Sequence, residues 1–452
     1  MAINLGGLEI SKAFLGSTEV ISAYLGDVLV YSSEDTTSFI TTWRTTTPNE
    51  TITIPTNSLY VYNYNITTSD GQEFTGVTGD QTITFATAGD YDVSINIDDI
   101  IGGAFPSIYF DNTGDKLKII DIKQWGAIVW GGFFRSFYGC SNLTGSYTDV
   151  ANTVNVTDMR EMFRSASSFN QPLNNWDTSS VITMAGMFRS ASSFNQPLNF
   201  DTSSVTSMGY MFQRASSFNQ DLNWDTSSVT NMNGTFSQAI NFNQPLIWDT
   251  SSVTNMAGTF SQATSFNQPL NWNTSSVITM DSMFRRASSF NQSLNWNTGN
   301  VTSMKVLFQS ATAFNSTITF SDTSNVTRMD QMFQSASSFD QPLNFDTSSV
   351  TSMYYMFSGA SSFDQPLNWD ITSVTDMVNM FNGETLSTSN YDEILIYWEN
   401  ELQTAFPNGS GYTPTISISF GNSQYTGTGS AANAKASLIS NFNWTITDGG
   451  IA

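Results

Sequence analysis

The amino-acid sequence repeats one motif ten times at steps of 24 or 25 residues. The phenylalanine of each Met-Phe-like pair marks the repeat, at Phe163, Phe188, Phe212, Phe236, Phe260, Phe284, Phe308, Phe333, Phe357 and Phe381. A degenerate copy, FYGCSNL at 137–143, precedes them. A unit this short cannot bury its apolar face alone, whereas stacked copies share one continuous core. The repeat therefore predicts a solenoid of about eleven turns.

Within one unit, the apolar residues follow two different spacings. Steps of 3, 3, 1 and 3 predict one stripe of a short helix, made by Val205, Met208, Met211, Phe212 and Ala215. Asp201, Thr202 or Ser203 before this stretch is expected to cap the N-terminus of the helix. The shared parity of Phe218, Leu222 and Trp224 predicts a brief inward-facing strand. Each turn is thus expected to hold a strand and a short helix.

The apolar repeat positions allow a core and a binding interpretation. Methionine recurs three residues after a valine, from Met159 to Met377, and a Met-rich groove for partners is conceivable. Thr235, Thr259 and Leu307 replace the second methionine, which favours gap-filling core. The aromatic ladder could stack sugars if exposed, but its exchange of Trp for Phe favours burial. It comprises Trp176, Phe200, Trp224, Trp248, Trp272, Trp296, Phe320, Phe345 and Trp369.

Two polar ladders accompany this core. The acidic ladder could bind calcium, but asparagine takes the same place at Asn273 and Asn297, which favours capping. Its carboxylates are Asp177, Asp201, Asp225, Asp249, Asp346 and Asp370. A second ladder, from Asn170 to Asn291 and continued by Asp340 and Asp364, is expected to bond neighbouring turns or a bend in its own turn.

The repeats differ mainly at outward positions, between the two methionines and just after the phenylalanine. If a partner is recognised along the array, these positions are its candidate binding surface; the alternative is an ordinary solvated face. The candidates are Arg189, Tyr210, Arg214, Arg285, Arg286, Tyr354 and Tyr355.

Composition excludes several classes of site. Fifteen basic and 38 acidic residues give a net charge of −23, which argues against nucleic-acid and anionic-membrane partners. The absence of histidine excludes Ser-His-Asp and Cys-His catalysis and imidazole metal sites. Cys140 is the single cysteine, takes a position that is Ala in later copies, and is expected to be a buried thiol. We therefore predict a non-enzymatic protein without catalytic, metal or cofactor site, and without a membrane span.

The flanking segments divide the chain into four expected regions. Residues 36–104 contain alternating Thr-rich runs (TITIPT, YVYNYNI, QTITFAT, YDVSINI) that predict a small β-sandwich. Residues 105–385 form the repeat region. Residues 386–452 predict a helix, a strand, a second helix and a closing strand, which suits an α/β C-terminal cap. Residues 1–35 form a separate N-terminal piece.

The repeat "VTSMGYMFQRASSFNQDLNWDTSS" resembles the surface-protein repeat of mycoplasma-type lipoproteins, a BspA-like relative of leucine-rich repeats. "SDGQEFTGVTGDQTITFATAGDYDVSI" is similar to a PKD-like sandwich. The resemblance implies a mainly β, leucine-rich-repeat-like protein with short helices, an Ig/PKD-like domain and an adhesive, non-enzymatic role at a cell surface.

The first residues depart from that family. MAINLGGLEI has no basic start and no apolar run of signal-peptide length. GLEISKAFLG and STEVISAYLG are two copies of a Gly-bounded decapeptide that predicts a small β-meander. This arrangement is similar to N-terminal segments of tailed-phage fibres, and it implies docking to other virion proteins through residues 1–35.

We therefore expect a bacteriophage virion protein of the tail-fibre, spike or head-fibre type, which attaches to a host surface protein or glycan. Self-association in the particle is a further option. The alternatives are a bacterial cell-surface adhesin and a polysaccharide-degrading tailspike. The tailspike would need a pair of carboxylates at about 5–9.5 Å, and the acidic residues form a ladder without a distinct pair.

Overall fold

The computed structural model describes residues 35–97 and 105–452, together with the backbone of six short N-terminal strands. These strands are β1 (Ile3–Leu5), β2 (Leu8–Ile10), β3 (Phe14–Leu15), β4 (Thr18–Glu19), β5 (Ser22–Leu25) and β6 (Val28–Ser32). They pair as β1–β2, β3–β4 and β5–β6, all antiparallel. The described strands thus make three separate hairpins where the sequence predicted one meander.

Two sheets follow the hairpins. Six strands form one sheet in the order β10-β9-β12-β7-β13-β14, and two strands form the other, β11-β8. The bounds are β7 (Phe39–Thr45), β8 (Glu50–Ile54), β9 (Tyr64–Thr68), β10 (Glu73–Val77), β11 (Gln81–Phe85), β12 (Gly89–Asn96), β13 (Ile119–Gln124) and β14 (Thr144–Gly145). Alternate residues of both sheets are fully buried, such as Trp43 and Val93 in one and Ile52 and Ile83 in the other. The period-2 pattern therefore places one face of each sheet in a common core.

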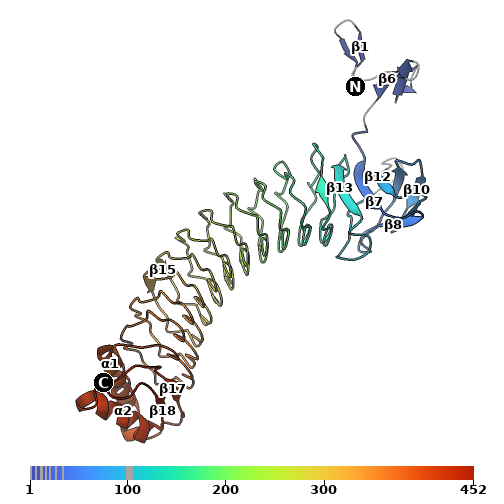
Figure 1. Cartoon of the computed structure of the whole chain (residues 1–452). Helices are drawn as coiled ribbons and strands as arrows, with labels where there is room; N and C mark the ends of the chain where they lie inside the picture. The colour runs from blue at the N-terminus through green and yellow to red at the C-terminus, as the bar shows by residue number, and fades with distance from the viewer. Residues whose placement is uncertain are drawn as a thin grey trace.

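Strand β13 joins these sheets to the repeat region. It pairs antiparallel with β7 and parallel with β14, which belongs to the first repeat. The six-stranded sheet therefore crosses the domain boundary that the sequence suggested at residue 105, and Figure 1 shows the two regions in continuous contact.

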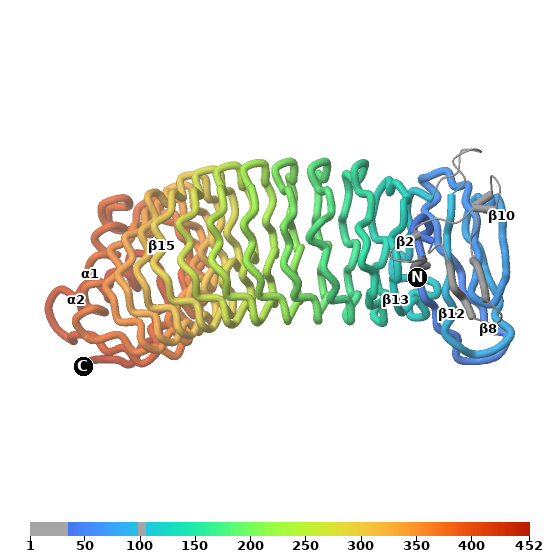
Figure 2. Tube along the Cα trace, turned by 90° about the horizontal axis from the view of Figure 1, so that it is seen from above, coloured from blue at the N-terminus to red at the C-terminus, as the bar shows by residue number. Residues whose placement is uncertain are grey.

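The repeats form coils that lie side by side along the long axis of the molecule (Figure 2). We name each coil by its marker phenylalanine. A ladder of parallel bridges connects every coil to the next, from Asp158 to Asp376. In the coil of Phe212, the amides of Met208, Tyr210, Phe212 and Arg214 donate to carbonyls of the following coil at 2.7 to 3.0 Å. The amides of Met211 and Gln213, which lie between them, donate to carbonyls three residues earlier in their own coil.

The short helix predicted for each unit is wrong. Residues 209–214 form successive tight turns, and Tyr210 and Arg214 have φ angles of 58° and 60°. An α-helix cannot hold residues in this left-handed region. The 3, 3, 1, 3 spacing nevertheless selected the correct inward residues, because the turns also point Met208, Met211, Phe212 and Ala215 into the core.

Aromatic stacks fill the interior. The marker rings follow one another at centroid distances of 5.4 to 5.9 Å between Phe163 and Phe381. Burial of the Trp/Phe ladder and of the repeat methionines is confirmed, and Cys140 is a buried free thiol, as predicted. Several ladder tryptophans also donate their indole N–H to the leucine carbonyl of the preceding coil, as Trp224 does to Leu198 at 3.0 Å. The ladder is therefore core, and it is not available for sugar stacking.

The coil stack is curved (Figure 1). Strands β15 (Leu294–Trp296) and β16 (Ile318–Phe320), which pair in parallel within the Trp/Phe ladder, lie on the outer side of the curve. Rings of the Trp/Phe ladder that stack between coils lie 5.8 to 6.4 Å apart, whereas the marker rings, next to the dense coil-to-coil hydrogen bonds, lie 5.4 to 5.9 Å apart. Hydrogen bonds from every second amide hold neighbouring coils close together on the side of the marker rings. The stack therefore bends towards it.

Polar ladders tie the coils together. Asn170 accepts the backbone N–H of Asn195 at 2.8 Å, and the same bond recurs through the stack to Asp364, which confirms the predicted role of this ladder. A second ladder was missed from the sequence. Buried Thr202 donates its hydroxyl to the carbonyl of Asp225 at 2.7 Å, and equivalent threonines do so along the stack.

The C-terminal segment lies on the last coil. It contains α1 (Thr388–Ala405), the 3-10 turn η2 (Pro407–Gly409), β17 (Ser417–Ser419), α2 (Gly429–Phe442) and β18 (Thr445–Thr447). The order of elements agrees with the sequence prediction. Phe420 stacks on Phe381 at 5.1 Å, so the marker-ring stack continues into this segment. Strands β17 and β18 pair in parallel, and the buried face of α1 contacts Phe420 through Tyr391 and Trp398.

Glu384 breaks the repeat pattern, because it takes the position that is alanine in the other nine repeats. Its side chain is buried, and Oε1 has no hydrogen-bond partner among the described residues. Burial, opposed in part by the Gly359 backbone, raises the pKa of this carboxyl from 4.5 to about 6. An acid with a raised pKa stabilises the fold fully below its unfolded pKa, and this stability is lost as pH rises through the folded value.

We therefore expect Glu384→Ala to increase the free energy of unfolding by about 1 to 2 kcal/mol at pH 8 and to change it little at pH 4. Chemical denaturation at the two pH values measures this difference. Glu393→Ala, at an exposed position of α1, is the control and should show no comparable pH-dependent gain. An equal destabilisation by Glu384→Ala at both pH values would contradict the prediction.

Candidate functional site

All nine lysines and arginines of residues 132–385 fall on one side of the coil stack. In each coil they lie in a segment of eight residues. It begins five residues before the marker phenylalanine and ends two residues after it, so in the coil of Phe212 it is 207–214. We call this side the basic strip; its cations are Arg135, Arg160, Arg164, Arg189, Arg214, Arg285, Arg286, Lys305 and Arg328. The acidic ladder from Asp177 to Asp370 lies outside this segment. The cations of the repeat region are thus confined to one side, which they share with Asp158, Glu161, Asp281, Asp330 and Asp376.

Backbone geometry creates the strip. In each coil, two of its positions have positive φ, at Tyr210 and Arg214 in the coil of Phe212. These left-handed turns direct side chains outward between buried residues, while the alternate amides bind the next coil. Equivalent side chains therefore recur at the coil spacing, and the strip is a regular, rigid surface.

Some cations of the strip are paired with carboxylates. Arg135 contacts Asp111 and Glu161 at 2.9 and 2.7 Å. The other pairs are Arg160–Asp158, Arg164–Glu161, Lys305–Asp281 and Arg328–Asp330. Arg189, Arg214, Arg285 and Arg286 form no ion pair with any acidic group in the described part of the chain. Burial and the neighbouring Arg164 lower the pKa of Arg189, and burial and Arg286 lower that of Arg285.

Aromatic side chains accompany the arginines at the first coils. The guanidinium carbons of Arg135 and Arg160 lie 4.9 and 4.7 Å from the Phe134 ring centroid, on one ring. Arg164 lies over Tyr138 and Arg189 over Tyr210. A hollow of about 230 Å3 opens between these groups, with Ala185, Gly186 and Gly209 in its lining. Cation–π contact holds the arginines flat at the surface.

A second hollow follows in the middle of the strip, with a volume of about 340 Å3. Arg214 and Arg286 stand at its ends, and Gln238 and Gln262 occupy the same coil position between them. Ser216, Ile240 and Thr264 complete the lining, and the Ile240 side chain is exposed. No carboxylate lines this hollow, so its potential is set by the two arginines.

The third hollow, of about 460 Å3, lies towards the C-terminal coils and differs in charge. Its cations, Lys305 and Arg328, are both paired, and Asp376 adds a further carboxylate. Tyr354 lines it and packs against Tyr355 at a centroid distance of 4.4 Å. This end of the strip is therefore not a cationic surface.

The seven residues that the sequence singled out all lie on the basic strip. Tyr210 and Arg189 line the first hollow, Arg214 and Arg286 the second, and Tyr354 the third. Arg285 and Tyr355 lie next to Arg286 and Tyr354 in sequence and line none of these three hollows. Phe134 and Arg135 were missed because the first copy is degenerate. The spacing of the repeat could have identified them: Phe133 lies four residues before Phe137, just as Met208 lies four residues before Phe212.

The family comparison covers the same coils. The model of the Mycoplasma protein of unknown function, DUF285, matches residues 132–223, 222–316 and 294–394. Together these three tandem matches span more than half of the chain. The chain belongs to the DUF285 family. The matches agree with the BspA-like resemblance of the repeats, while curated proteins and solved structures give no match to the chain.

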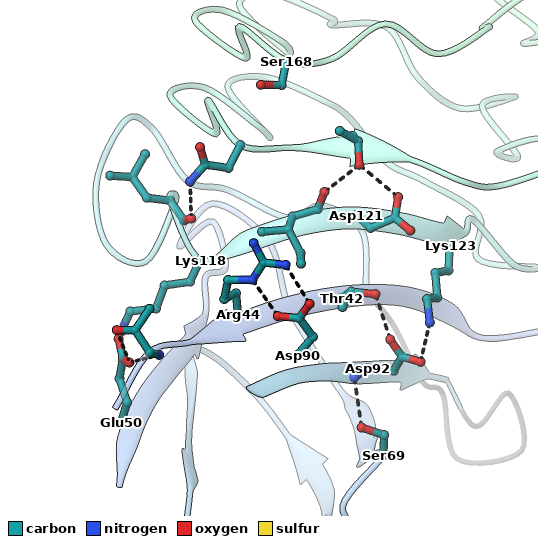
Figure 3. A pocket seen from close by; sticks show the side chains of 15 residues that line it. Thr42, Arg44, Glu50, Ser69, Asp90, Asp92, Lys118, Asp121, Lys123 and Ser168 are labelled. Atoms are coloured by element: carbon teal, nitrogen blue, oxygen red, sulfur yellow. Dashed lines mark hydrogen bonds and ion pairs between the residues drawn. The ribbon is translucent and has the colours of Figure 1, made fainter. Parts of the chain in front are cut away.

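A polar hollow of about 1050 Å3 lies on the exposed face of the six-stranded sheet (Figure 3). Most of the residues that line it precede the DUF285 coils. Its charges pair across strands: Arg44 with Asp90, and Lys123 with Asp92, both at 2.7 Å. Lys118 contacts Glu50 and Asp115 at 3.0 and 2.9 Å. Every cation here has an acidic partner, so we assign these groups to holding β7, β12 and β13 together.

The acidic ladder of the DUF285 coils makes local turns rather than the predicted helix caps. Asp201 accepts the backbone N–H of Ser203 at 3.0 Å and its hydroxyl at 2.6 Å, and this pattern recurs. The Ser203 hydroxyl, together with its amide, lowers the pKa of Asp201. The described residues contain no group of three or more His, Cys, Asp or Glu arranged to hold a metal ion. They also contain no helix that is long and apolar enough to cross a membrane.

Proposed function

We propose that this DUF285 protein is a non-enzymatic adhesin that presents its coil stack to a cell surface. One observation carries the proposal: the inward residues of every coil are near-identical, while the basic strip differs from coil to coil and gathers all the cations of the repeat region. A scaffold that needs only to fold has no use for a face that varies so much between coils and holds all the cations of the repeats. Binding surfaces commonly combine a rigid scaffold with variable outward residues.

In this proposal the regions of the chain have separate roles. The coil stack acts as a leucine-rich-repeat-like solenoid, and residues 386–452 cap its last open core. Strands β7 to β12, within residues 39–96, act as a PKD-like sandwich that spaces the solenoid from its anchor. Residues 1–35 are the anchor.

We further propose that the anchor docks to a bacteriophage particle, so that the protein acts as a fibre or spike in the virion. The decapeptide repeat and its short antiparallel hairpins support this role. A bacterial cell-surface adhesin is the second candidate, and the DUF285 repeat supports it. Both assign the same adhesive surface and differ in the anchor.

Deletion of residues 1–35 tests the anchor. We expect the truncated chain to retain its unfolding temperature, because the described sheets and coils have their own core. It should fail to enter particles, as measured by immunoblotting of purified virions, while the free protein still binds host cells. Normal incorporation of the truncated chain would contradict virion docking. Full-length protein found on cells and absent from particles would favour the cell-surface adhesin.

A further inference from the structure

We infer that the middle of the basic strip binds a linear acidic polysaccharide lengthwise, with its uronate carboxylates on Arg214 and Arg286. This inference rests on the proposed adhesive function and names the chemistry of its ligand. It starts from two facts about the central hollow: cations stand at both ends, and no carboxylate lies between them.

Hydrogen bonds to glutamine side chains fix arginine side chains of the strip without neutralising their charge. Arg214 donates its Nε–H to the side-chain oxygen of Gln238 at 3.1 Å, and Arg285 donates its own to Gln309 at 2.8 Å. The first bond orients the Arg214 guanidinium, and the second orients Arg285, the residue before Arg286. Arg214 and Arg286 have no acidic partner among the described residues. A guanidinium of fixed orientation matches the planar, two-oxygen geometry of a carboxylate. The side-chain amides thus serve as supports that do not neutralise the charge.

The lining between the arginines suits sugar rings. Gln238, Gln262, Ser216 and Thr264 offer both hydrogen-bond donors and acceptors, as sugar hydroxyls require. Ile240, which is 44% exposed, offers apolar contact to a ring face. Successive coils present equivalent groups at marker-ring spacings of 5.6 to 5.8 Å over the coils from Phe212 to Phe284. This period is close to the length of one sugar residue in an extended polysaccharide, so neighbouring coils can meet neighbouring sugars.

The acidic charge of the whole chain does not prevent such binding. The Debye length at physiological salt is about 8 Å, so carboxylates on other sides of the coil are largely screened from a ligand on the strip. Asp281, the carboxylate nearest to Arg286 in sequence, lies on the strip but lines the third hollow, where it accepts the Ser303 hydroxyl and the Lys305 backbone N–H. Asp201, Asp225 and Asp249 lie outside the strip and are engaged in turn hydrogen bonds. The ligand therefore meets the local cations, and its affinity should fall as salt rises.

The test measures binding of oligogalacturonate by the full chain and by Arg214→Gln/Arg286→Gln. Glutamine already occupies the same position at Gln238 and Gln262, both with φ of 61°, so the variant suits the backbone. We expect about a 100-fold loss of affinity in titration calorimetry, since each charge-assisted contact contributes about tenfold. Lys116→Gln/Lys123→Gln removes the same charge away from the strip and should bind as the parent does. Thermal unfolding verifies that both variants fold.

The inference would be overturned by an unchanged affinity in the arginine variant, by an equal loss in the lysine control, or by equal binding of neutral dextran. Dextran sulfate that binds as tightly as oligogalacturonate in parent and variant alike would show ion exchange without uronate recognition, and would also overturn it. In any of these cases host-cell binding by the free protein would still support the adhesive function, so the two failures are distinguishable.

Discussion

Replacing Phe260 with aspartate is expected to unfold the central coils and to lower the stability of the whole array. The ring is fully buried and stacks on Phe236 and Phe284, in the coils on either side, at 5.7 and 5.8 Å. It also stacks on Phe266 in its own coil at 3.9 Å. The substitution removes these contacts and leaves a carboxylate without a partner in the core. We expect a loss of about 5 kcal/mol or more.

Circular dichroism during thermal and chemical denaturation measures this loss. Asn271→Asp places the same new charge at an exposed position of the same coil and is the matched control. It should change stability by less than about 0.5 kcal/mol. Because each coil contacts only its neighbours, Phe260→Asp should also split the unfolding transition or broaden it. A single unshifted transition would contradict the stacking of the repeats.

The inside and outside of the coils could be predicted from the sequence because the repeat reports each environment many times. A position that is always Met, Phe or Ala in successive copies faces the same core in each of them. A single copy would not have separated core from surface so well. This is why burial of Trp224 and Met208 followed from the pattern, although the local backbone did not.

The backbone of the coils could not be predicted, because its hydrogen-bond partners lie in another repeat. The amide of Phe212 could donate to the carbonyl of Met208 in a helix or to that of Thr235 in the next coil. Both choices bury the same side chains, so the local spacing is compatible with each. Stacking decides between them: it satisfies alternate amides through Thr235 and its equivalents and leaves the others to tight turns. The buried Thr202 ladder was missed for the same reason.

The candidate surface was located only in part. Variation between copies identified Arg214 and Arg286 as outward residues. That they line one hollow depends on the two coils between them, which contribute Ile240 and Gln262 to the same lining. The sequence shows that arginine and tyrosine recur, but only the stack shows which of the cations lack a carboxylate partner.

The C-terminal segment is stabilised by a largely buried charge cluster that lies outside the repeats. Removing the carboxylate of this cluster is the second change from which we expect a large effect. Asp448, with 6% of its side chain exposed, accepts the Lys435 ammonium and the Tyr391 hydroxyl, each at 2.6 Å. Asp448→Ala would leave Lys435 without its carboxylate in a largely buried site, since only 14% of the lysine side chain is exposed. Breaking a buried pair in this way should cost about 3 kcal/mol.

Denaturation of a graded series tests this. Asp448→Asn keeps an acceptor and should lose less than Asp448→Ala, while Asp448→Ala/Lys435→Met removes both charges and should recover part of the loss, because the buried unpaired ammonium is gone. Loss of helical signal from α1 and α2 should precede loss of the coil signal, since Tyr391 lies on α1 and Lys435 on α2. If the double variant is as unstable as Asp448→Ala alone, the unpaired charge is not the cause, and the hydrogen bonds of Asp448 to Tyr391 and Gly450 carry the stability instead.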